Sequence, residues 1–296
     1  MNAESTERES ILRLLQSGQL QNIELGLALA ESLQIDIEEF KNDIEFIHNW
    51  IIAKQATWLN KGAHQLTLQE KIVRIHSMKE LYLSRLKLTK LPNQINYFTG
   101  ITSLSADANK LTNLPAEIGC LTRLEYVTIS ENQLASLPLQ IGNLSNLLSL
   151  NLSYNQLCEI PKELFQCIKL HHLYLNDNQL DCIPPNIKNL ENLYELHLKG
   201  NPLTSFPSEI ANLTRLTDLD LDKTNLEYLP LELFSLASLE KLNLSDNKLT
   251  SLPPEISKLT RLTLLYLNNN PLPDSEIEKV KSLLPDCEIV FETTTD

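Results

Sequence analysis

Residues 124–146, LEYVTISENQLASLPLQIGNLSN, decide the fold of this 296-residue chain, because residues 147–169, LLSLNLSYNQLCEIPKELFQCIK, repeat the same order of residue types. The step between the two stretches is 23 residues, and it continues in both directions without a gap. A fixed period of this length indicates stacked units that each bury an apolar face against the next. The sequence predicts nine units, beginning at Met78, Ile101, Leu124, Leu147, Leu170, Leu193, Leu216, Leu239 and Leu262.

Two polar landmarks recur on the same step. One position is asparagine in seven of the nine units, and it is Leu86 or Thr224 in the other two. The asparagines are Asn109, Asn132, Asn155, Asn178, Asn201, Asn247 and Asn270. A second position is a proline preceded by an apolar residue, at Pro92, Pro115, Pro138, Pro161, Pro184, Pro207, Pro230 and Pro253.

Elementary chemistry turns this pattern into a structure. The LxLxx part of each unit alternates with period two, so it predicts a short strand with leucines inward and the intervening residues outward. The chain must then turn while its backbone is being buried, and an inward asparagine can both donate to and accept from that backbone. The proline lacks an N–H group and favours an extended or short 3₁₀ return rather than a full helix.

The consensus LxxLxLxxNxLxxLPxxIxxLxx over residues 78–272 resembles the leucine-rich repeat. Its 23-residue length and LPxxI segment resemble the intracellular class found in Ras-suppressor-type and scribble-type scaffolds and in bacterial cytoplasmic leucine-rich repeat proteins. The resemblance implies an α/β solenoid, a right-handed curved horseshoe with a parallel β-sheet on its concave face and a helical N-terminal cap. It also implies a non-enzymatic scaffold that binds a protein or peptide through the concave face.

Both ends of the array need a polar cover, since the terminal units would otherwise expose the leucine core. Residues 1–54 show helical spacing of apolar residues, and the first 50 contain ten acidic and three basic side chains. We expect an acidic helical N-terminal cap over 1–54 and a degenerate leading repeat over 55–77. The segment 273–296 predicts a C-terminal cap, consisting of a helix, a last strand and a tail.

Composition excludes several classes of protein. The formal net charge of -13 repels nucleic acid and anionic membranes, so no nucleic-acid partner is expected. No apolar run approaches the about 18 residues that span a bilayer, which argues against membrane insertion. The polar, acidic first ten residues lack the order of a secretory signal, so we expect a cytoplasmic protein.

The chemical motifs of enzymes are missing from the sequence. GxxxxGK[ST], GxGxxG, HExxH and GxSxG do not occur, and only seven glycines are present. The five cysteines contain no CxxC pair, so we expect buried free thiols rather than a metal site. The sequence therefore predicts no enzymatic activity, no cofactor and no metal, although a Cys/His nucleophile pair stays formally open.

The outward positions of the strands are free of packing duties, so they are the place to expect recognition. Tyrosine, histidine and charged residues gather there in the fifth to seventh units, and tyrosine combines a large contact area with a polar tip. We expect a partner-binding site composed of Tyr126, Tyr154, His172, Tyr174, Glu195, His197, Lys199, Asp218, Asp220, Asp222, Lys241 and Tyr266. A merely solvated polar face is the alternative for each of these residues.

Asp218, Asp220 and Asp222 alternate along one strand and should point the same way. A solvated row, a basic partner that neutralises it and a bound cation are all open, although a straight strand does not wrap ligands around one point as calcium sites do. Protonation of His172 and His197 could make binding sensitive to pH.

Two other functions stay open besides the scaffold. The chain could be a recognition arm like those of bacterial effectors associated with ubiquitin ligases, or a module that works through its acidic N-terminal helices. Glu38, Glu39 and Asp43 on the polar side of these helices would discriminate the second case. Partner identity and oligomeric state are left undetermined by the sequence.

Overall fold

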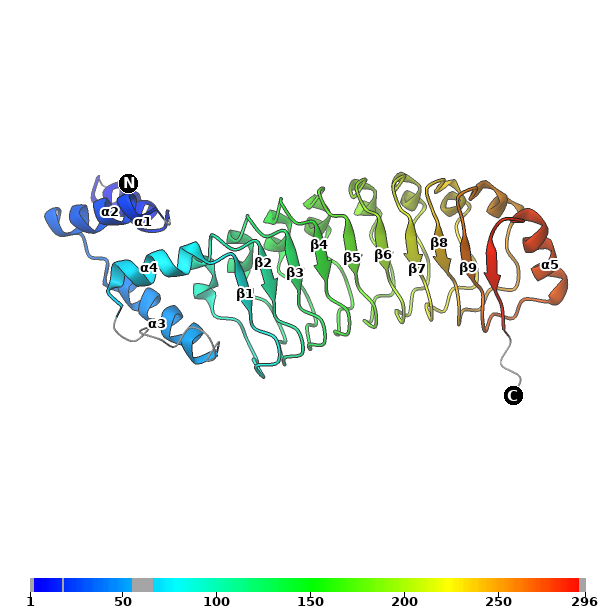
Figure 1. Cartoon of the computed structure of the whole chain (residues 1–296), viewed down its shortest axis with the longest axis horizontal. Helices are drawn as coiled ribbons and strands as arrows, with labels where there is room; N and C mark the ends of the chain where they lie inside the picture. The colour runs from blue at the N-terminus through cyan, green and yellow to red at the C-terminus, as the bar shows by residue number, and fades with distance from the viewer. Residues whose placement is uncertain (1–2, 18, 55–65, 293–296) are drawn as a thin grey trace.

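The computed structural model describes residues 3–17, 19–54 and 66–292. Its centre is one sheet of ten parallel strands that follow each other in chain order, β1 to β10 (Figure 1). The strands are β1 Glu80–Tyr82, β2 Ser103–Ser105, β3 Tyr126–Thr128, β4 Ser149–Asn151, β5 His172–Tyr174, β6 Glu195–His197, β7 Asp218–Asp220, β8 Lys241–Asn243, β9 Leu264–Tyr266 and β10 Glu288–Val290. From β1 to β9 the pairing register advances by 23 residues per strand, as the sequence period requires.

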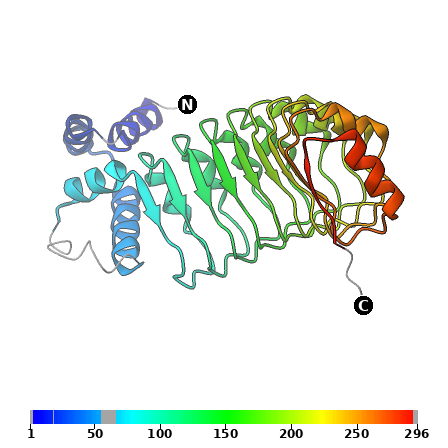
Figure 2. The same cartoon turned by 45° about the vertical axis from the view of Figure 1, so that its right-hand side comes forward.

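Short 3₁₀ helices return the chain behind the sheet (Figure 2). Each begins directly after the proline of the repeat, whose fixed φ and missing N–H suit this position. They are η2 Asn93–Tyr97, η3 Ala116–Cys120, η4 Leu139–Asn143, η5 Lys162–Gln166, η6 Pro185–Asn189, η7 Ser208–Asn212, η8 Leu231–Ser235 and η9 Pro254–Lys258. The predicted 3₁₀ returns are present in these eight segments.

The core lies between the sheet and these returns. Leu150, Leu173 and Leu196 are paired neighbours on successive strands, and each is at most 1% exposed. Large side chains from the returns, such as Phe165 and Phe234, close the core from behind. The predicted fold class, an α/β repeat solenoid with a parallel sheet and a helical N-terminal region, is confirmed.

The inward asparagines form a ladder that ties each unit to the one before it. The Asn155 Nδ2 donates to the carbonyl oxygen of Ile129 in the preceding unit at 3.0 Å and to that of Leu152 in its own unit at 3.0 Å. Its Oδ1 accepts from the Leu134 N–H of the preceding unit at 3.0 Å. One amide thus satisfies three buried backbone groups that no strand or helix can reach.

The residue before each ladder position adopts a left-handed backbone. A positive φ at this place occurs in all nine units, at Arg85, Ala108, Glu131, Tyr154, Asp177, Gly200, Lys223, Asp246 and Asn269. Only one of the nine is glycine, so the other eight carry the steric cost of this conformation, about 1 kcal/mol or more each. The tight turn is therefore imposed by the ladder and the stacked leucines rather than by local preference.

Four α-helices precede the array: α1 Ala3–Leu15, α2 Leu20–Ser32, α3 Glu38–Lys54 and α4 Leu68–Ser77. The side chain of Asp43 on α3 accepts hydrogen bonds from Gln94 Nε2 at 2.8 Å and Tyr97 Oη at 3.1 Å, which anchors α3 to the first return. Burial and the nearby Asp43 carboxylate both raise the pKa of Tyr97, so its hydroxyl stays a donor. The α1–α2 pair lies beyond α4, at the end of the molecule (Figure 1).

The predicted division of the chain stays a prediction at its N-terminal end. Of the degenerate leading repeat over 55–77, residues 55–65 lie outside the described residues, and α4 occupies most of the rest. Residues 70–74 of α4 stand 23 residues before η2, so α4 takes the place of a return in the repeat register. At the other end α5 Asp274–Leu283 and β10 follow the last unit.

The ladder generates a stability prediction. Asn155→Ala orphans a buried N–H and two carbonyl groups, and each buried group without a partner costs about 1–3 kcal/mol. We expect the free energy of unfolding, measured by urea denaturation, to fall by at least about 2 kcal/mol. Gln156→Ala, at the exposed neighbouring position, is the control and should change stability little. Equal effects of the two substitutions would contradict the role of the ladder.

Asp43 generates a second prediction. Asp43→Ala removes the acceptor for Gln94 and Tyr97, and we expect a loss of about 1–2 kcal/mol together with faster amide hydrogen exchange in α3. Glu31→Ala on the exposed side of α2 is the matched control. Unchanged exchange in α3 after Asp43→Ala would show that apolar packing alone holds this helix.

Candidate functional site

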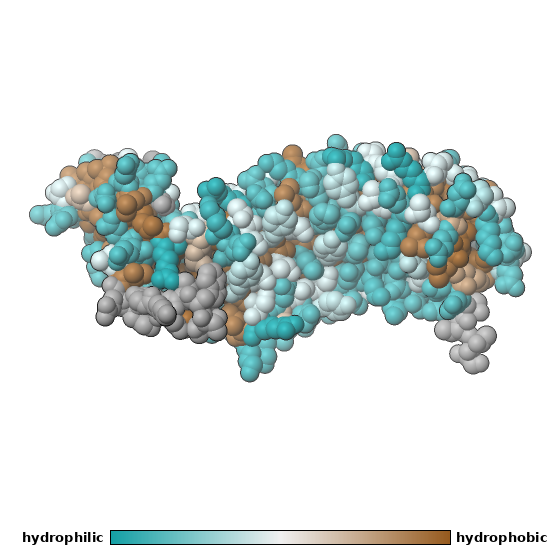
Figure 3. Space-filling model, viewed as in Figure 1, coloured by the Kyte–Doolittle hydropathy of each residue, from teal (hydrophilic) through white to brown (hydrophobic). Residues whose placement is uncertain are grey.

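The predicted polar residues of the fifth to eighth units lie on neighbouring strands of the exposed sheet surface, here called the strand face. His172, Glu195, Asp218 and Lys241 form one cross-strand row over β5–β8. Tyr174, His197, Asp220 and Asn243 form the adjacent row. Figure 3 shows a largely hydrophilic surface over these middle strands, with more apolar surface toward the two ends.

His172, Tyr174, Glu195, His197, Asp218 and Lys241 make one connected group, here called the β5–β8 cluster. The Tyr174 hydroxyl donates a hydrogen bond to Glu195 Oε2, and His172 Nδ1 lies 3.4 Å from the same oxygen. Burial and the Glu195 carboxylate raise the pKa of Tyr174, so the phenol is neutral. Its ring meets that of His197 edge-on, with centroids 4.9 Å apart.

Asp218 is held between two basic groups. The His197 Nε2 lies 3.6 Å from Asp218 Oδ1, and the Lys241 Nζ donates to Oδ2 at 3.2 Å. Burial alone would raise the pKa of Asp218, but the His197 and Lys241 contacts outweigh it and lower the value. Asp218 is therefore a paired carboxylate rather than a member of a bare acidic row.

A second ion pair lies one row further along the strands. The Lys199 Nζ contacts Asp222 Oδ2 at 2.7 Å, and this hydrogen bond raises the pKa of Lys199. Asp222 is only 5% exposed, so its charge is compensated within the protein. The row of Asp218, Asp220 and Asp222 thus separates into two paired carboxylates and one, Asp220, with a different task.

Asp220 caps the backbone where its strand ends. Its Oδ1 accepts from the Asp222 N–H at 3.1 Å, as the Oδ1 of Asn151 and Asn243 does at the same position of other units. Burial raises the pKa of Asp220, because no cation approaches it as closely as Lys241 approaches Asp218. Its equivalence to two asparagines shows that the capping does not require the charge.

The other predicted site residues lie apart from the cluster. Tyr126 is 50% exposed on β3, and Tyr154 is 56% exposed at the left-handed turn after β4. Tyr266 on β9 pairs with Val290 of β10, near the C-terminal end. A hollow of about 230 Å³ beside the cluster is lined by Ser130, Glu131, Asn151, Ser153, Tyr154, Tyr174 and Asn176.

The sequence reasoning did not single out Asp107, which is the hub of a hydroxyl network. Its Oδ1 accepts from Thr128 Oγ1 at 2.5 Å and from the Ser130 N–H and hydroxyl at 2.7 Å each. Burial opposes ionisation, but these donors outweigh it and lower the pKa of Asp107. The signal was a lone carboxylate among hydroxyl residues at outward positions of three consecutive units.

The described residues contain no group of three or more histidine, cysteine or acidic side chains arranged to hold a metal ion. The five cysteines are free, and the expectation of buried thiols is wrong for three of them. Cys167 is buried, whereas Cys120, Cys158 and Cys182 are exposed, since they lie at outward positions of the returns and loops. Within residues 3–17, 19–54 and 66–292, no helix is long and apolar enough to cross a bilayer.

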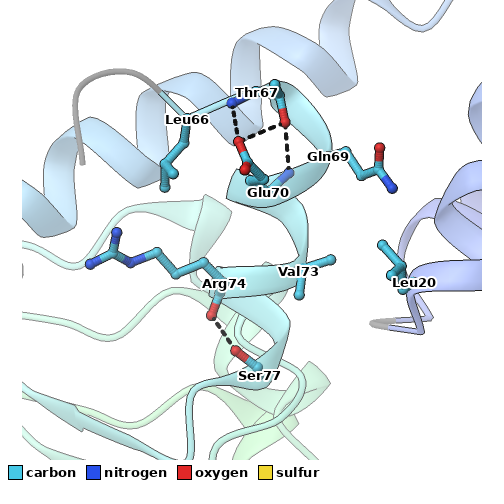
Figure 4. A pocket seen from close by; sticks show the side chains of 8 residues that line it. All are labelled: Leu20, Leu66, Thr67, Gln69, Glu70, Val73, Arg74 and Ser77. Carbon is cyan, nitrogen blue, oxygen red and sulfur yellow. Dashed lines mark hydrogen bonds between the residues drawn. The ribbon is translucent and has the colours of Figure 1, made fainter. Parts of the chain in front are cut away.

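A further groove, of about 740 Å³, lies far from the strand face, between α2 and α4 (Figure 4). Leu20 and Val73 give it an apolar side. At its other side Thr67 and Glu70 bond each other in the capping box that starts α4. Its polar groups serve the helix, so the groove shows no unsatisfied group that would select a ligand.

Comparisons with known families agree with this geometry. Residues 116–220 match a leucine-rich repeat region model, and residues 214–272 match a second leucine-rich repeat model. Together they span 116–272, more than half of the chain, so the chain belongs to the leucine-rich repeat proteins. Members of this family generally serve as protein-interaction modules without enzymatic activity. No curated protein sequence matches the chain.

Solved structures show the same fold. The plant peptide hormone receptor RGFR1 in complex with RGF2 is 30% identical with a TM-score of 0.60, over 76% of this chain and 41% of the receptor chain. The GASSHO1/SCHENGEN3 receptor kinase ectodomain of Arabidopsis thaliana, in complex with CASPARIAN STRIP INTEGRITY FACTOR 2, is 28% identical with a TM-score of 0.56, over 76% and 34%. A leucine-rich repeat protein of Leptospira interrogans is 26% identical with a TM-score of 0.31, over 75% and 86%. The chain thus spans less than half the length of the two receptors.

The two roles of Asp220 can be separated by isosteric substitution. Asp220→Asn keeps the capping oxygen and removes a buried charge, so we expect equal or higher stability at neutral pH. Asp220→Ala loses the cap and should cost about 1 kcal/mol in urea denaturation.

The effect of pH follows from the raised pKa of Asp220. Because the folded value exceeds the unfolded one, the contribution to stability is full below the unfolded pKa of about 3.9 and is lost as pH rises through the folded value. Any advantage of Asp220→Asn should therefore appear at neutral pH and vanish near pH 3. An advantage that persists in acid would contradict the assignment.

Proposed function

We propose that this chain is a scaffold that binds a protein or peptide partner through the strand face, with the β5–β8 cluster as the centre of the contact. One observation carries the proposal. The six side chains of the cluster contact one another, and none of their hydrogen bonds goes to the backbone of the array. The fold does not need these groups, unlike Asp220 and the ladder asparagines.

The chemistry of the cluster suits a protein interface. Tyr174 and His197 present ring surface with polar tips, and such residues commonly dominate interface energies when a partner excludes water around them. Tyr154 adds exposed aromatic area beside the same hollow. A partner would meet ordered side chains, so little conformational entropy would be lost on binding.

The charge of this surface favours a basic partner. Glu195, Asp218, Asp220 and Asp222 face Lys199 and Lys241 across the same strands, so carboxylates outnumber lysines while the histidines are neutral. Acidification would protonate His172 and His197 and reduce this excess, which makes the proposed binding sensitive to pH. Screening by salt should weaken the attraction as well.

The finer class and location of the protein also belong to the proposal. The unbroken 23-residue units with LPxxI favour the intracellular class of leucine-rich repeats. Exposed free thiols at Cys120, Cys158 and Cys182 suit a reducing compartment such as the cytoplasm. The receptors that resemble the array were solved with peptide ligands, which supports a peptide as one form of the partner.

The N-terminal helices are the second candidate, because Leu25 and Leu33 of α2 and Phe46 of α3 are each close to half exposed. Such apolar exposure suits a docking role in addition to a cap over residues 1–54. Asp43 does not discriminate the two roles, since it bonds to Gln94 and Tyr97 in the first return. Glu38 and Glu39 are exposed and remain suitable for that test.

Affinity measurement tests the strand face directly. The immobilised chain captures partners from lysate of the source cells, and each purified partner is titrated by calorimetry against wild type and Tyr174→Ala/His197→Ala. Central aromatic anchors contribute about 2 kcal/mol or more, so we expect at least about 30-fold weaker binding by the double variant. The wild-type affinity should also fall between about pH 7.5 and 5.5.

Tyr82→Ala is the matched control, because Tyr82 occupies the position of Tyr174 on β1 at the far end of the sheet. It should bind the partner like wild type, and circular dichroism should show that all variants fold. Unchanged affinity of the double variant would remove the strand face, and loss of binding by Glu38→Ala/Glu39→Ala would then point to the helices.

A further inference from the structure

A row of basic residues follows the lateral edge of the array, where the chain enters the strands. The position before the first residue of each unit reads, from the third unit onward, Arg123, Asn146, Lys169, Asn192, Arg215, Ser238 and Arg261. Every second unit therefore carries a cation, and no unit carries an acid there. Arg123, Lys169, Arg215 and Arg261, here called the edge stripe, are all exposed.

The edge stripe lacks internal ion pairs, which is unusual in a chain with a net charge of -13. Within the described part of the chain, none of the four lies within 4.0 Å of a carboxylate oxygen. Lys169 Nζ instead donates to Asn146 Oδ1 at 2.8 Å, and Arg215 Nη1 donates to Asn192 Oδ1 at 2.9 Å. The cations keep their charge uncompensated.

The intervening asparagines hold these cations in place. Asn146 Nδ2 donates to the Thr122 carbonyl oxygen at 2.8 Å, and Asn192 Nδ2 donates to the Ile168 carbonyl oxygen at 2.9 Å. Each amide is thus fixed to the backbone, with its oxygen directed at the cation of the next unit. Such positioning reduces the entropy that the long side chains would lose on binding an anion.

The middle of the edge stripe carries apolar and aromatic surface. Ile168 is 56% exposed beside Lys169. The His171 and Tyr194 ring centroids lie 5.2 Å apart, and the Arg215 guanidinium lies 4.7 Å from the centre of the Tyr194 ring. A partner that fits this edge therefore needs apolar side chains at its centre and separated negative charges along its length.

The spacing of the cations matches one element of secondary structure. Neighbouring strands lie about 4.8 Å apart, so cations on alternate units are about 10 Å apart, and the four span about 29 Å. Seven residues of an α-helix rise about 10.5 Å, and about 20 residues span the whole stripe. A helix with a carboxylate at every seventh residue would place one opposite each cation.

We propose that the edge stripe docks an acidic amphipathic α-helix of a partner protein, with carboxylates seven residues apart on Arg123, Lys169, Arg215 and Arg261. Apolar residues between these carboxylates contact Ile168 and Tyr194. Glu125, Glu191 and Glu240 occupy neighbouring repeat positions between the cations. They repel a continuous polyanion such as nucleic acid, and they select a ligand whose charges are discrete and in register.

Two synthetic helical peptides of identical composition test the proposal. One carries glutamate at every seventh residue with leucine on the same face, and the other has the same residues with the glutamates out of this register. Fluorescence anisotropy at low salt should show tighter binding of the first peptide to the full chain. Single-stranded oligonucleotide and anionic phospholipid vesicles are the arms for other polyanions, and neither should compete with it.

Lys169→Glu/Arg215→Glu should weaken binding of the registered peptide by about tenfold or more, because two exposed ion pairs become repulsions. Lys110→Glu/Lys248→Glu makes the same charge change at exposed lysines outside the edge stripe, and it should retain most of the affinity. The proposal is overturned by equal binding of both peptides, by no binding, by equal loss in the two charge variants, or by preference for the oligonucleotide or vesicles.

The outcome is independent of the strand face. Tyr174→Ala/His197→Ala should bind the registered peptide as wild type does, since neither residue belongs to the edge stripe. Loss of the peptide in that variant would assign it to the strand face and overturn the proposal for the edge. Circular dichroism of each variant separates a binding defect from a folding defect.

Discussion

The structure depends on one interaction, the buried amide that joins each repeat to its neighbour. Every ladder asparagine accepts from an N–H 21 residues before it and donates to a carbonyl oxygen 26 residues before it, as Asn178 does with Leu157 and Leu152. These two spans fix the length of the unit, because an added or missing residue would move the amide away from both partners. Leucine burial supplies most of the free energy, but the ladder supplies the register.

The two units without a ladder asparagine show what the amide does for the turn. Besides the left-handed residue common to all nine units, the residue after Leu86 and the residue after Thr224 also have positive φ, at Lys87 and Asn225. Without its usual amide partner, the Leu203 N–H bonds to the Asn201 carbonyl oxygen. The amide therefore limits the distortion of the turn to one residue, and its loss spreads the left-handed backbone to a second.

The sequence predicts the fold well because the same few residue types answer the same physical demand nine times. It predicts which side chains reach the strand face, but not what they meet there. Asp218 and Asp220 share a residue type and a direction, yet their pKa values shift in opposite directions, since Asp218 contacts His197 and Lys241. Such differences depend on cross-strand distances of a few ångströms, which a repeat pattern does not encode.

The need to cap strand ends limits where recognition residues can lie. In the fourth, seventh and eighth units Asn151, Asp220 and Asn243 cap the backbone from the middle outward position, so a tyrosine or histidine there would leave an N–H without this partner. In the sixth unit Asn176 of the preceding unit caps the Lys199 N–H instead. That cap leaves the middle position free for His197, which can then pair with Asp218 and pack against Tyr174. A polar residue that serves the backbone of one unit thus makes a binding side chain possible in the next.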